Sequence, residues 1–589
     1  MKYYCNPLNI RYPYQFFDKG DYIQASRESA DPSMVFFKNR YYLFPSMAAG
    51  FYTSEDLSEF TFHAFKNKMP VYGYAPDIRI IRGELYFCAM EPNGMLGIYK
   101  TKDPLEQKFV KLNEVKGGGD PCLFEDDDGR IYLYWGCSRL HPIYGVELSA
   151  EDMTPVGTRK ILIYSNTKEL GYERNGENHI ETYTRREMEE FMEQKLLADP
   201  TIENTQIPYE YMKLCNATNI EGPYMTKYKG TYYLQYAATG TEHNVYCDAV
   251  YVSKKPLGPF TVPGNNPFAY KPEGFITGSG HGSTFKGEEE RYFHISCLRI
   301  SRQHLFERRL GLWPVGFDED NEMYCDQRYG DWPVRTDAKP FEKPDWMLLS
   351  YKKKVSVSSG EMAECICDED IRTWWRADGN KNEWAAVDLG SVCDVRVVQI
   401  NFADDKIILI REMFDGNTIS SNRGRVIDME PRKIRWHLEW SVDGEAYFSL
   451  KDKSEAETDL SHDLVVTDNG IKARYIRLWI YEVPFGQRPC ISGLRVFGRM
   501  EKKLPQQPEY IRGRMIGNLD AYIFWNKVYD AVGYNLLWGH EEDKLYHSCM
   551  VYDRNEKLIA ALVKGQKLFV RVDAFNEAGI TEGRVTEIR

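Results

Sequence analysis

The sequence contains no hydrophobic run long enough for a membrane-spanning helix. Its first residues, MKYYCNPLNIRYPYQFF, include neither an apolar segment nor the small-residue cleavage site of a secretory signal. These absences argue against a helical membrane protein and against an exported precursor. We therefore expect the protein to remain in the cytoplasm, with no membrane as a partner.

Cysteine patterns for metals and disulfides are also missing. The 13 cysteines are odd in number, contain no Cys-x-x-Cys pair and form no cysteine and histidine cluster at zinc spacing. Such cysteines are typical of reduced, mostly buried thiols. They predict no structural metal site.

Positive charge is in deficit, because 75 Lys and Arg against 87 Asp and Glu give a net charge of -12. Nucleic acids bind clustered Lys and Arg, which replace counterions, so no nucleic acid is expected as a partner. Aromatic residues are abundant, at 14% of the chain. Flat rings suit both β-rich cores and stacking against sugars, and a neutral substrate fits the charge.

Five segments in the first 340 residues share one plan: an ionisable residue, a short apolar strand, a tight polar turn and a second strand rich in Tyr. A chain of 589 residues needs two to four domains, and such a repeat predicts a five-bladed β-propeller over residues 1–340. The segments are DPSMVFFKNRYYLF from Asp31, DIRIIRGELYF from Asp77, DPCLFEDDDGRIYLYW from Asp120, EGPYMTKYKGTYYLQY from Glu221 and HGSTFKGEEERYFHI from His281.

The spacing of these segments is uneven at one point. Their first residues lie 46, 43, 101 and 60 residues apart, whereas one blade needs roughly 40 to 50 residues. Within the long interval, Thr184 and Glu187 form a capping box and Met188, Phe191 and Leu196 share one helical face. We expect a helical insertion at about residues 165–210.

The innermost strand of each blade lines the central channel, so the five leading residues are expected to converge at one mouth. Two carboxyl groups across a pocket can hydrolyse a glycosidic bond, one as proton donor and one acting on water or on the anomeric carbon. A third carboxylate beside the donor would raise the donor's pKa. The five converging residues are Asp31, Asp77, Asp120, Glu221 and His281.

After Pro340 the pattern changes to short strands with Trp anchors. Residues 345–500 predict a β-sandwich, and residues 506–589 predict a second, smaller sandwich. The fold class is therefore all-β.

Residues 1 to about 335 resemble a family 43 glycoside hydrolase, a five-bladed propeller enzyme that inverts the anomeric centre. The resemblance rests on five motifs in blade order, whereas fructan-active relatives carry different start and acid motifs. These motifs are Asp31-Pro32, Ala75-Pro76-Asp77, the Asp-Pro-x-Leu-Phe-x-Asp-x-Asp-Gly run from Asp120, Glu221-Gly222-Pro223 and Gly280-His281-Gly282-Ser283.

The resemblance implies a role for each catalytic residue. Asp31 is the expected general base, Glu221 the general acid, and Asp120 the carboxylate that tunes and orients the acid. His281 resembles a channel histidine that approaches an ion or ordered water. A calcium ion in the propeller channel near His281 is therefore a candidate ligand. No cofactor is expected to be required. A buried structural histidine is the alternative.

Four further residues are candidates for substrate binding. Asp77 could instead hold Arg79, and Arg308 could form an ion pair at a blade edge. Phe51 and Trp135 follow inner strands and could wall the sugar subsite, with core packing as the alternative.

The region 345–500 resembles a discoidin-like (coagulation factor type C) domain, a jelly-roll β-sandwich, and residues 506–589 resemble a fibronectin type III domain. These domains could bind carbohydrate or mediate assembly; the oligomeric state stays open.

The expected function is an inverting exo-glycosidase that releases terminal α-L-arabinofuranosyl or β-D-xylosyl residues from plant-derived oligosaccharides. The alternatives are a glycosidase of the same fold for another terminal sugar, such as β-D-galactofuranose or galactose, and a non-catalytic carbohydrate-binding propeller.

Overall fold

The computed structural model of the chain describes residues 1–66, 69, 75–139, 141–180, 190, 194, 218–301, 304, 306–410, 417–420 and 425–589. Strands dominate the described residues, so the all-β prediction is confirmed. No helix in these ranges is long and apolar enough to cross a membrane. The helices with described bounds are short 3₁₀ segments: η1 (Pro104–Glu106), η2 (Gly171–Glu173), η3 (Glu177–His179), η4 (Glu288–Glu290), η5 (Ala363–Cys367) and η7 (Pro484–Gly486).

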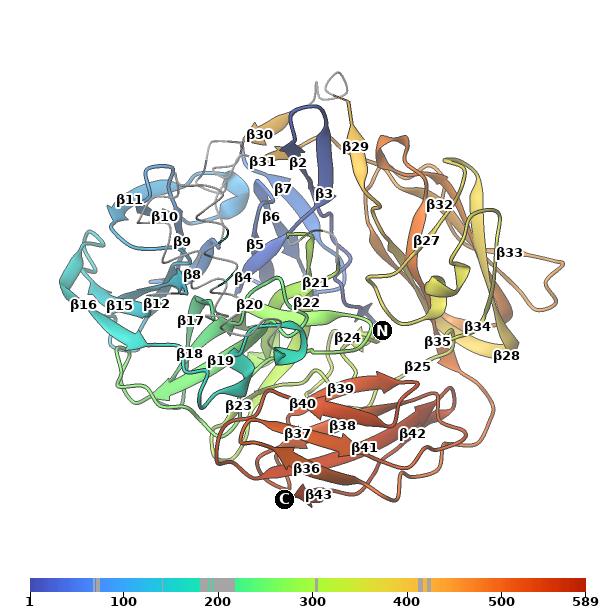
Figure 1. Cartoon of the computed structure of the whole chain (residues 1–589). Helices are drawn as coiled ribbons and strands as arrows, with labels where there is room; N and C mark the ends of the chain where they lie inside the picture. Colours follow the sequence, from blue (N-terminus) through green and yellow to red (C-terminus); the bar gives the residue numbers. More distant parts are fainter. Residues whose placement is uncertain are drawn as a thin grey trace.

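Five four-stranded antiparallel sheets occupy residues 30–325 and lie around a common centre (Figure 1). Sheets 1 to 3 follow chain order. They contain β4 (Ala30–Phe37), β5 (Arg40–Ser46), β6 (Gly50–Ser54) and β7 (Thr61–Ala64); β8 (Asp77–Ile81), β9 (Glu84–Met90), β10 (Leu96–Thr101) and β11 (Val110–Val115); and β12 (Cys122–Glu125), β13 (Ile131–Trp135), β15 (Ile143–Leu148) and β16 (Pro155–Ile163).

Sheets 4 and 5 complete this group. They contain β14 (Cys137–Ser138), β17 (Ile220–Tyr228), β18 (Thr231–Ala238) and β19 (Cys247–Ser253), and β20 (Thr277–Lys286), β21 (Tyr292–Arg299), β22 (Arg308–Phe317) and β23 (Met323–Cys325). Strand β14 continues from sheet 3 but pairs with β17, with Cys137 opposite Glu221. This short strand therefore joins two sheets.

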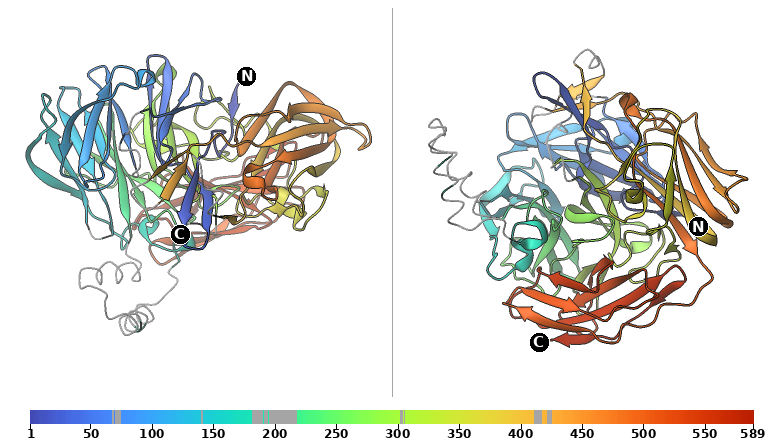
Figure 2. Two further views of the ribbon diagram at one scale, coloured as in Figure 1. Left: turned by 90° about the horizontal axis from the view of Figure 1, so that it is seen from above. Right: turned by 45° about the vertical axis from the view of Figure 1, so that its right-hand side comes forward.

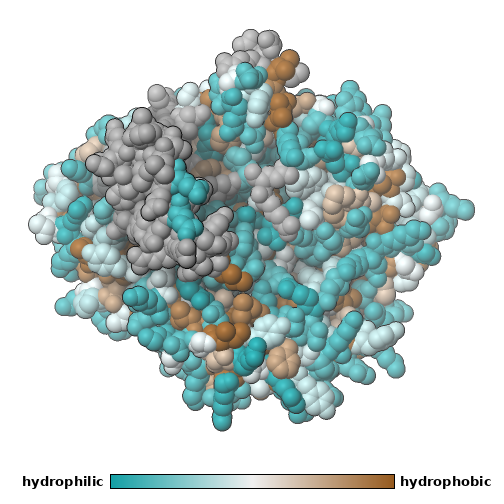
Figure 3. Space-filling model, viewed as in Figure 1, coloured by the Kyte–Doolittle hydropathy of each residue, from teal (hydrophilic) through white to brown (hydrophobic). Residues whose placement is uncertain are grey.

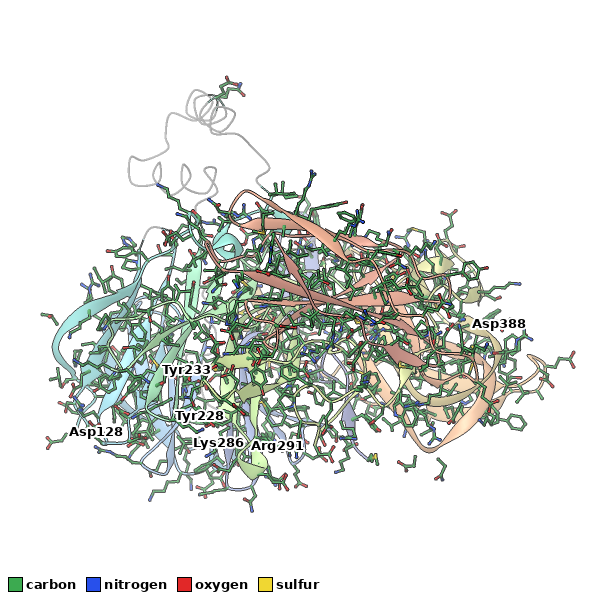
Figure 4. All side chains as sticks on the ribbon, turned by 90° about the horizontal axis from the view of Figure 1, so that it is seen from below. Asp128, Tyr228, Tyr233, Lys286, Arg291 and Asp388 are labelled. Carbon is green, nitrogen blue, oxygen red and sulfur yellow. The ribbon has the colours of Figure 1, made fainter. Side chains whose placement is uncertain are left out.

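The first hairpin of several sheets closes as the sequence predicts. Both turn residues have positive φ at Lys38-Asn39, at Arg82-Gly83 and at Lys229-Gly230, which is the backbone of a two-residue hairpin. Asp128 and Lys286, which lie in or beside such turns, are on one side of the molecule with Tyr228 (Figure 4). The inner strands therefore end on this side, and their first residues lie toward the opposite side.

The predicted helical insertion is only partly described. Residues 165–180 contain η2 and η3 rather than an α-helix, and Gly171 donates its backbone N–H to Leu562 O at 2.8 Å. A Cβ at Gly171 would lie 2.8 Å from two backbone oxygens, so only glycine fits this approach. The capping box and apolar face at 184–196 lie outside the described residues.

The middle region is built on one continuous eight-stranded sheet rather than on two separate sheets. The long strands β28 and β34 pair in three stretches, separated by register shifts between Asp388 and Cys393 and between Val395 and Val397. The sheet encloses its own apolar core, which includes Trp375 and Trp436. Its strands are β25 (Met347–Leu348), β26 (Lys354–Val357), β27 (Trp375–Arg376), β28 (Glu383–Phe402), β32 (Arg435–Ser441), β33 (Phe448–Lys453), β34 (His462–Glu482) and β35 (Cys490–Arg499).

A separate five-stranded sheet crosses the expected boundary at residue 340. It combines a hairpin from the start of the chain with three strands of the middle region, and these strands lie side by side in Figure 1. Its order is β29 (Ile407–Leu409), β3 (Ile23–Arg27), β2 (Tyr14–Asp18), β31 (Arg425–Asp428) and β30 (Thr418–Ser420). The first and middle regions are therefore interleaved. A two-stranded sheet of β1 (Tyr3–Tyr4) and β24 (Val334–Arg335) also closes the start of the chain onto residue 335.

Two sheets form the C-terminal region, which packs beneath the five sheets (Figures 1 and 2). One apolar core joins both regions and includes Tyr236, Tyr270, Trp525 and Trp538. The sheets contain β36 (Arg512–Ile516), β37 (Asp520–Phe524) and β40 (Glu556–Ile559), and β38 (Gly533–Gly539), β39 (His547–Tyr552), β41 (Leu568–Asn576), β42 (Gly579–Thr581) and β43 (Thr586–Ile588).

The described cysteines agree with the sequence analysis. Twelve of them are unpaired, and eleven of these are buried; Cys137 is the exposed one. The face in Figure 3 is mostly hydrophilic, with scattered hydrophobic patches.

Candidate active site

Each of the five sheets begins with the same backbone corner. One residue at this corner has a left-handed φ and is followed by Pro or Gly: Asp31 (45°), Ala75 (56°), Asp120 (59°), Gly222 (59°) and His281 (52°). Left-handed φ is uncommon for residues other than glycine and is concentrated where the surrounding structure requires it. Three of the five residues predicted from the sequence, Asp31, Asp120 and His281, occupy this corner. In the other two sheets Ala75 and Gly222 occupy it, in place of Asp77 and Glu221.

Asp77 and Glu221 lie away from the corner position. Asp77 is two residues beyond Ala75, and Glu221 precedes Gly222 by one. Asp77 accepts hydrogen bonds from Ser33 Oγ at 3.0 Å, Leu123 N at 2.7 Å and Arg79 Nε at 3.1 Å. Its carboxylate is 2% exposed and links neighbouring sheets. The placement of Asp77 beside the other carboxylates is therefore wrong, and the geometry favours the alternative in which it holds Arg79.

Asp31 lies among cationic and hydrogen-bonding groups. Arg308 Nη1 donates to Oδ1 at 2.9 Å and Ser46 Oγ donates to Oδ2 at 2.8 Å, while His281 Nδ1 lies 3.4 Å from Oδ1. Burial alone would raise the pKa of Asp31, but Arg308, His281 and the hydrogen bonds from Ser46 and Cys297 lower it below its ordinary value. Asp31 is thus held as a carboxylate.

Asp120 has the opposite environment. Burial and the nearby carboxylates Glu221 and Asp31 raise the pKa of Asp120 to about 7, against the effect of His281 and the Gly222 N–H. The Gly222 N–H donates to Asp120 Oδ2 at 3.2 Å. This carboxyl therefore carries a proton over much of the range below neutral pH.

His281 lies between the two aspartates. Its Nδ1 is 3.4 Å from Asp31 Oδ1 and 3.9 Å from Asp120 Oδ2. Burial lowers the pKa of His281, but Asp31, Asp120, Glu221 and Asp248 together raise it above its ordinary value, which favours the imidazolium. A Cβ on Gly222 would come within 2.6 Å of this ring, so glycine leaves room for the histidine.

Glu221 is held by three donors. Tyr246 Oη donates to Oε1 at 2.5 Å, and Asn219 Nδ2 and Cys137 Sγ donate to Oε2 at 2.5 and 3.2 Å. Glu221 is half-buried. One oxygen each of Asp120 and Glu221 and the Cys137 sulfur lie within 4.8 Å of one another. The acid and tuner predicted from the sequence are therefore neighbours.

The predicted substrate residue Arg308 instead supports Asp31. It is 3% exposed and also donates to Glu28 Oε1 from Nη2 at 2.7 Å and from Nε at 3.0 Å. Its guanidinium is directed at two carboxylates, and this arrangement favours the alternative in which Arg308 forms a buried ion pair.

Phe51 and Trp135 have different surroundings. Phe51 is 0% exposed and stacks on Phe44 with ring centroids 4.9 Å apart, so its assignment to the sugar pocket is wrong and it packs in the core between sheets 1 and 2. Trp135 stacks on Tyr144 and lines a cavity of about 620 Å³. Cys137, which contacts Glu221, lies on the same wall. This cavity is within the size range of small-ligand sites.

The residues around His281 do not fit calcium. Calcium prefers six to eight oxygen ligands. Of the two carboxylate oxygens near His281 Nδ1, the nearer one, Asp31 Oδ1 at 3.4 Å, already accepts from Arg308, and the cationic Arg308 and His281 would repel a divalent ion. The Asp120, Cys137 and Glu221 cluster includes a thiol that donates to Glu221 rather than a thiolate ligand.

Comparison with known proteins places the chain in a family. The profile of Glycosyl hydrolases family 43 matches residues 25–182 and 180–323. A search of curated proteins found no match.

Several solved structures are similar over part or most of the chain. A protein described as a glycoside hydrolase is 17% identical, with 80% of this chain and 97% of that one covered and a TM-score of 0.41. An exo-1,5-alpha-L-arabinanase from a bovine ruminal metagenomic library is 21% identical, with 51% and 98% covered and a TM-score of 0.37. An endo-1,4-beta-xylanase from Bacteroides thetaiotaomicron is 19% identical, with 53% and 97% covered and a TM-score of 0.39.

The matched residues 25–323 include all of Asp31, Asp120 and Glu221 and span half of the chain. The chain therefore belongs to glycosyl hydrolases family 43, and it is a glycoside hydrolase with a carbohydrate substrate.

Proposed function

We propose that the protein is an inverting exo-glycosidase that releases terminal α-L-arabinofuranosyl or β-D-xylosyl residues from plant-derived oligosaccharides. In this proposal the five sheets are the blades of a β-propeller, and the catalytic groups lie at one mouth of its channel. The observation that carries the proposal is the pair of opposed environments, with an ionised Asp31 on one side and a proton-carrying Asp120 beside Glu221 on the other.

Asp31 acts as the general base. A base must be ionised to take a proton from water, and the lowered pKa of Asp31 keeps it so at neutral and mildly acidic pH. Ser46 and Arg308 engage different oxygens of this carboxylate and so fix its orientation. The activated water then attacks the anomeric carbon from the face opposite the leaving group.

Glu221 acts as the general acid that protonates the leaving-group oxygen. One oxygen of Asp120 and one of Glu221 lie within 4.8 Å of each other, and Asp120 keeps its proton until the pH rises through about 7. Asn219 and Tyr246 bind opposite oxygens of Glu221 and restrict its rotation. Asp120 tunes the acid without touching the reacting atoms.

The cavity lined by Trp135, Tyr144 and Cys137 is the candidate site for the leaving group, because Cys137 connects its wall to Glu221. Trp135 keeps its proposed role in sugar binding there. A glycosidase for another terminal sugar, such as β-D-galactofuranose or galactose, uses the same carboxylates and is the second candidate. A non-catalytic carbohydrate-binding propeller is disfavoured, because binding alone does not require opposed carboxyl environments.

In this proposal the chain has three domains. The propeller spans residues 1–340, a discoidin-like domain spans 345–500, and a fibronectin type III-like domain spans 506–589. The enzyme is cytoplasmic and requires no cofactor. The described donor set makes the calcium ion considered near His281 a poor fit.

A panel of nitrophenyl glycosides tests this function. The α-L-arabinofuranoside or the β-D-xyloside should be hydrolysed fastest, and Asp31→Asn should abolish the same activity. Preference for a galactoside or galactofuranoside would transfer the assignment to the second candidate. No turnover with any glycoside, together with measurable sugar binding, would support the non-catalytic alternative.

A further inference from the structure

The middle region reaches the catalytic base through one chain of buried charged groups. Arg425, at the start of β31, donates from Nη1 to Glu28 Oε2. Glu28 Oε1 accepts from Arg308 Nη2 at 2.7 Å, and Arg308 Nη1 donates to Asp31 Oδ1 at 2.9 Å. Glu28 is 0% exposed, and Arg425, Arg308 and Asp31 are each 3% exposed.

The backbone fixes both ends of this chain of contacts. Arg425 pairs in the sheet with Phe17, and its guanidinium lies 5.3 Å from the Phe17 ring and 4.9 Å from the Phe306 ring. Arg308 begins β22, in sheet 5. The position of Arg425 is therefore set by the interleaved sheet, whereas Asp31 is set by the corner of sheet 1.

A second buried ion pair holds the same two regions together. Arg27, on β3, donates from Nε to Asp404 Oδ2 at 3.0 Å and lies 2.6 Å from Asp459 Oδ2 through Nη1. Removing one partner from such a pair leaves an uncompensated buried charge, which is strongly unfavourable. The middle region is thus joined firmly to the residues that precede Asp31.

We propose that the middle region is part of the catalytic machinery, with Arg425 and Glu28 as positioning residues that set the charge and orientation of Asp31 through Arg308. This inference rests on the proposed role of Asp31 as the base. It assigns to the middle region a task different from binding carbohydrate or mediating assembly.

The sign of each effect follows from the charges. Among the residues that the structure describes, the groups that face Asp31 are Arg308, His281, Asp120, Tyr246 and the Cys297 thiol. Those that face Glu28 are Arg308, Arg425 and, at longer range, His304. In the four-residue set, Arg425 and Arg308 balance Glu28 and Asp31. Removing Arg425 leaves one excess negative charge, which disfavours ionised Asp31; removing Glu28 leaves one excess positive charge, which favours it.

The experiment measures the acidic limb of the pH dependence of kcat/KM in the full chain. Activity falls along this limb as the base is protonated. Arg425→Gln should move the limb up by roughly half to one pH unit, and Glu28→Gln should move it down by a similar amount. The double variant restores neutrality and should return the limb close to its original position.

A matched control is Arg432→Gln. Arg432 follows the same strand but donates to Asp428 Oδ2 at 2.7 Å and not to Glu28, so its removal should leave the limb in place. Partial unfolding reduces the amount of active enzyme without moving the limb. If Arg425→Gln yields no folded protein, the acidic limb of Glu28→Gln still tests the proposal: a downward shift supports it, and an unchanged limb contradicts it.

Limbs that stay fixed in Arg425→Gln and Glu28→Gln, or that move in the same direction, would overturn the inference while leaving the proposed function intact. A wild-type protein with no glycosidase activity would overturn the proposed function, and the inference would fall with it.

Discussion

The surroundings of Asp31 and Glu221, the proposed base and acid, differ in their chemistry. On the Asp31 side, a cationic arginine and a histidine with a raised pKa lie beside the carboxylate, and Arg308 is itself paired with buried Glu28. On the Glu221 side, neutral donors from Tyr246, Asn219 and Cys137 contact the carboxylate, and an oxygen of the carboxyl group of Asp120 lies within 4.8 Å.

In the proposed mechanism, this difference fits the separate roles that the family resemblance implies for Asp31, Asp120 and Glu221. Positive charge around Asp31 favours the ionised form, as a base requires. Carboxyl groups placed together favour retention of a proton, as an acid requires. The assignment of base and acid therefore follows from surroundings rather than from residue type.

The largest expected loss of activity comes from replacing Asp31. Asp31→Asn keeps the size of the side chain but cannot accept a proton from water, so kcat should fall by roughly 10³-fold to 10⁴-fold on every substrate, whatever its leaving group. Steady-state kinetics on one activated and one poor leaving group measure this. A loss confined to the poor leaving group would assign Asp31 to the acid side.

The next effect comes from Glu221→Gln, which cannot donate a proton. Substrates with poor leaving groups should lose roughly 10²-fold to 10⁴-fold in rate, whereas activated aryl glycosides need less protonation and should lose less. The comparison uses the same two substrates. Equal losses on both would remove Glu221 from the role of acid.

Asp120→Asn should sharpen the comparison through pH. Without the neighbouring carboxyl group, the alkaline limb of the rate profile should move to lower pH, while the acidic limb set by Asp31 should move much less. The full pH dependence of both proteins checks this. An alkaline limb that stays in place or moves upward would leave Asp120 without its tuning role.

The same substitution should also change stability. The pKa of Asp120 is raised on folding, so its contribution to stability is present below the unfolded value near 4 and is lost as the pH rises through about 7. Asparagine does not ionise. At pH 8, Asp120→Asn should therefore melt about 2 to 6 °C higher than wild type, with the difference shrinking toward pH 4 in calorimetry.

The smallest effects come from the donors to Glu221. Tyr246→Phe removes one hydrogen bond and should lower kcat by roughly 3-fold to 10-fold on poor leaving groups. Cys137→Ser keeps a donor and should change the rate by less than about 3-fold. A larger loss in Cys137→Ser than in Tyr246→Phe would mean that the thiol has a role that a hydroxyl does not replace.

Much of the fold could be predicted from local sequence patterns. Period-two strands and tight turns at Lys38-Asn39 and Lys229-Gly230 are local signals, so the hairpins were predictable. The interleaved sheet was not, because β2 pairs with β31 across about 400 residues of chain. The short segment 425–428 has no sequence pattern from which its pairing with β2 could be predicted.

The site was predictable where it depends on position along a strand and not where it depends on neighbours in space. Asn219 lies two residues before Glu221 and directly before β17, so its closeness along the chain could have been used. Cys137 and Glu28 meet the catalytic groups only through strand pairing and domain packing. Phe51 was misassigned because the sequence shows an aromatic residue near an inner strand without showing what it contacts. The carboxylate partners of Arg308, Asp31 and Glu28, were not visible in the sequence for the same reason.

The anomeric configuration of the first product tests the account most directly. An ionised base that activates water opposite a protonated acid should invert the anomeric centre in a single displacement. Proton NMR during the first minutes of hydrolysis of an aryl pentoside should show the inverted sugar before mutarotation. An initial product that retains its configuration would contradict the assignment of Asp31 as base and Glu221 as acid.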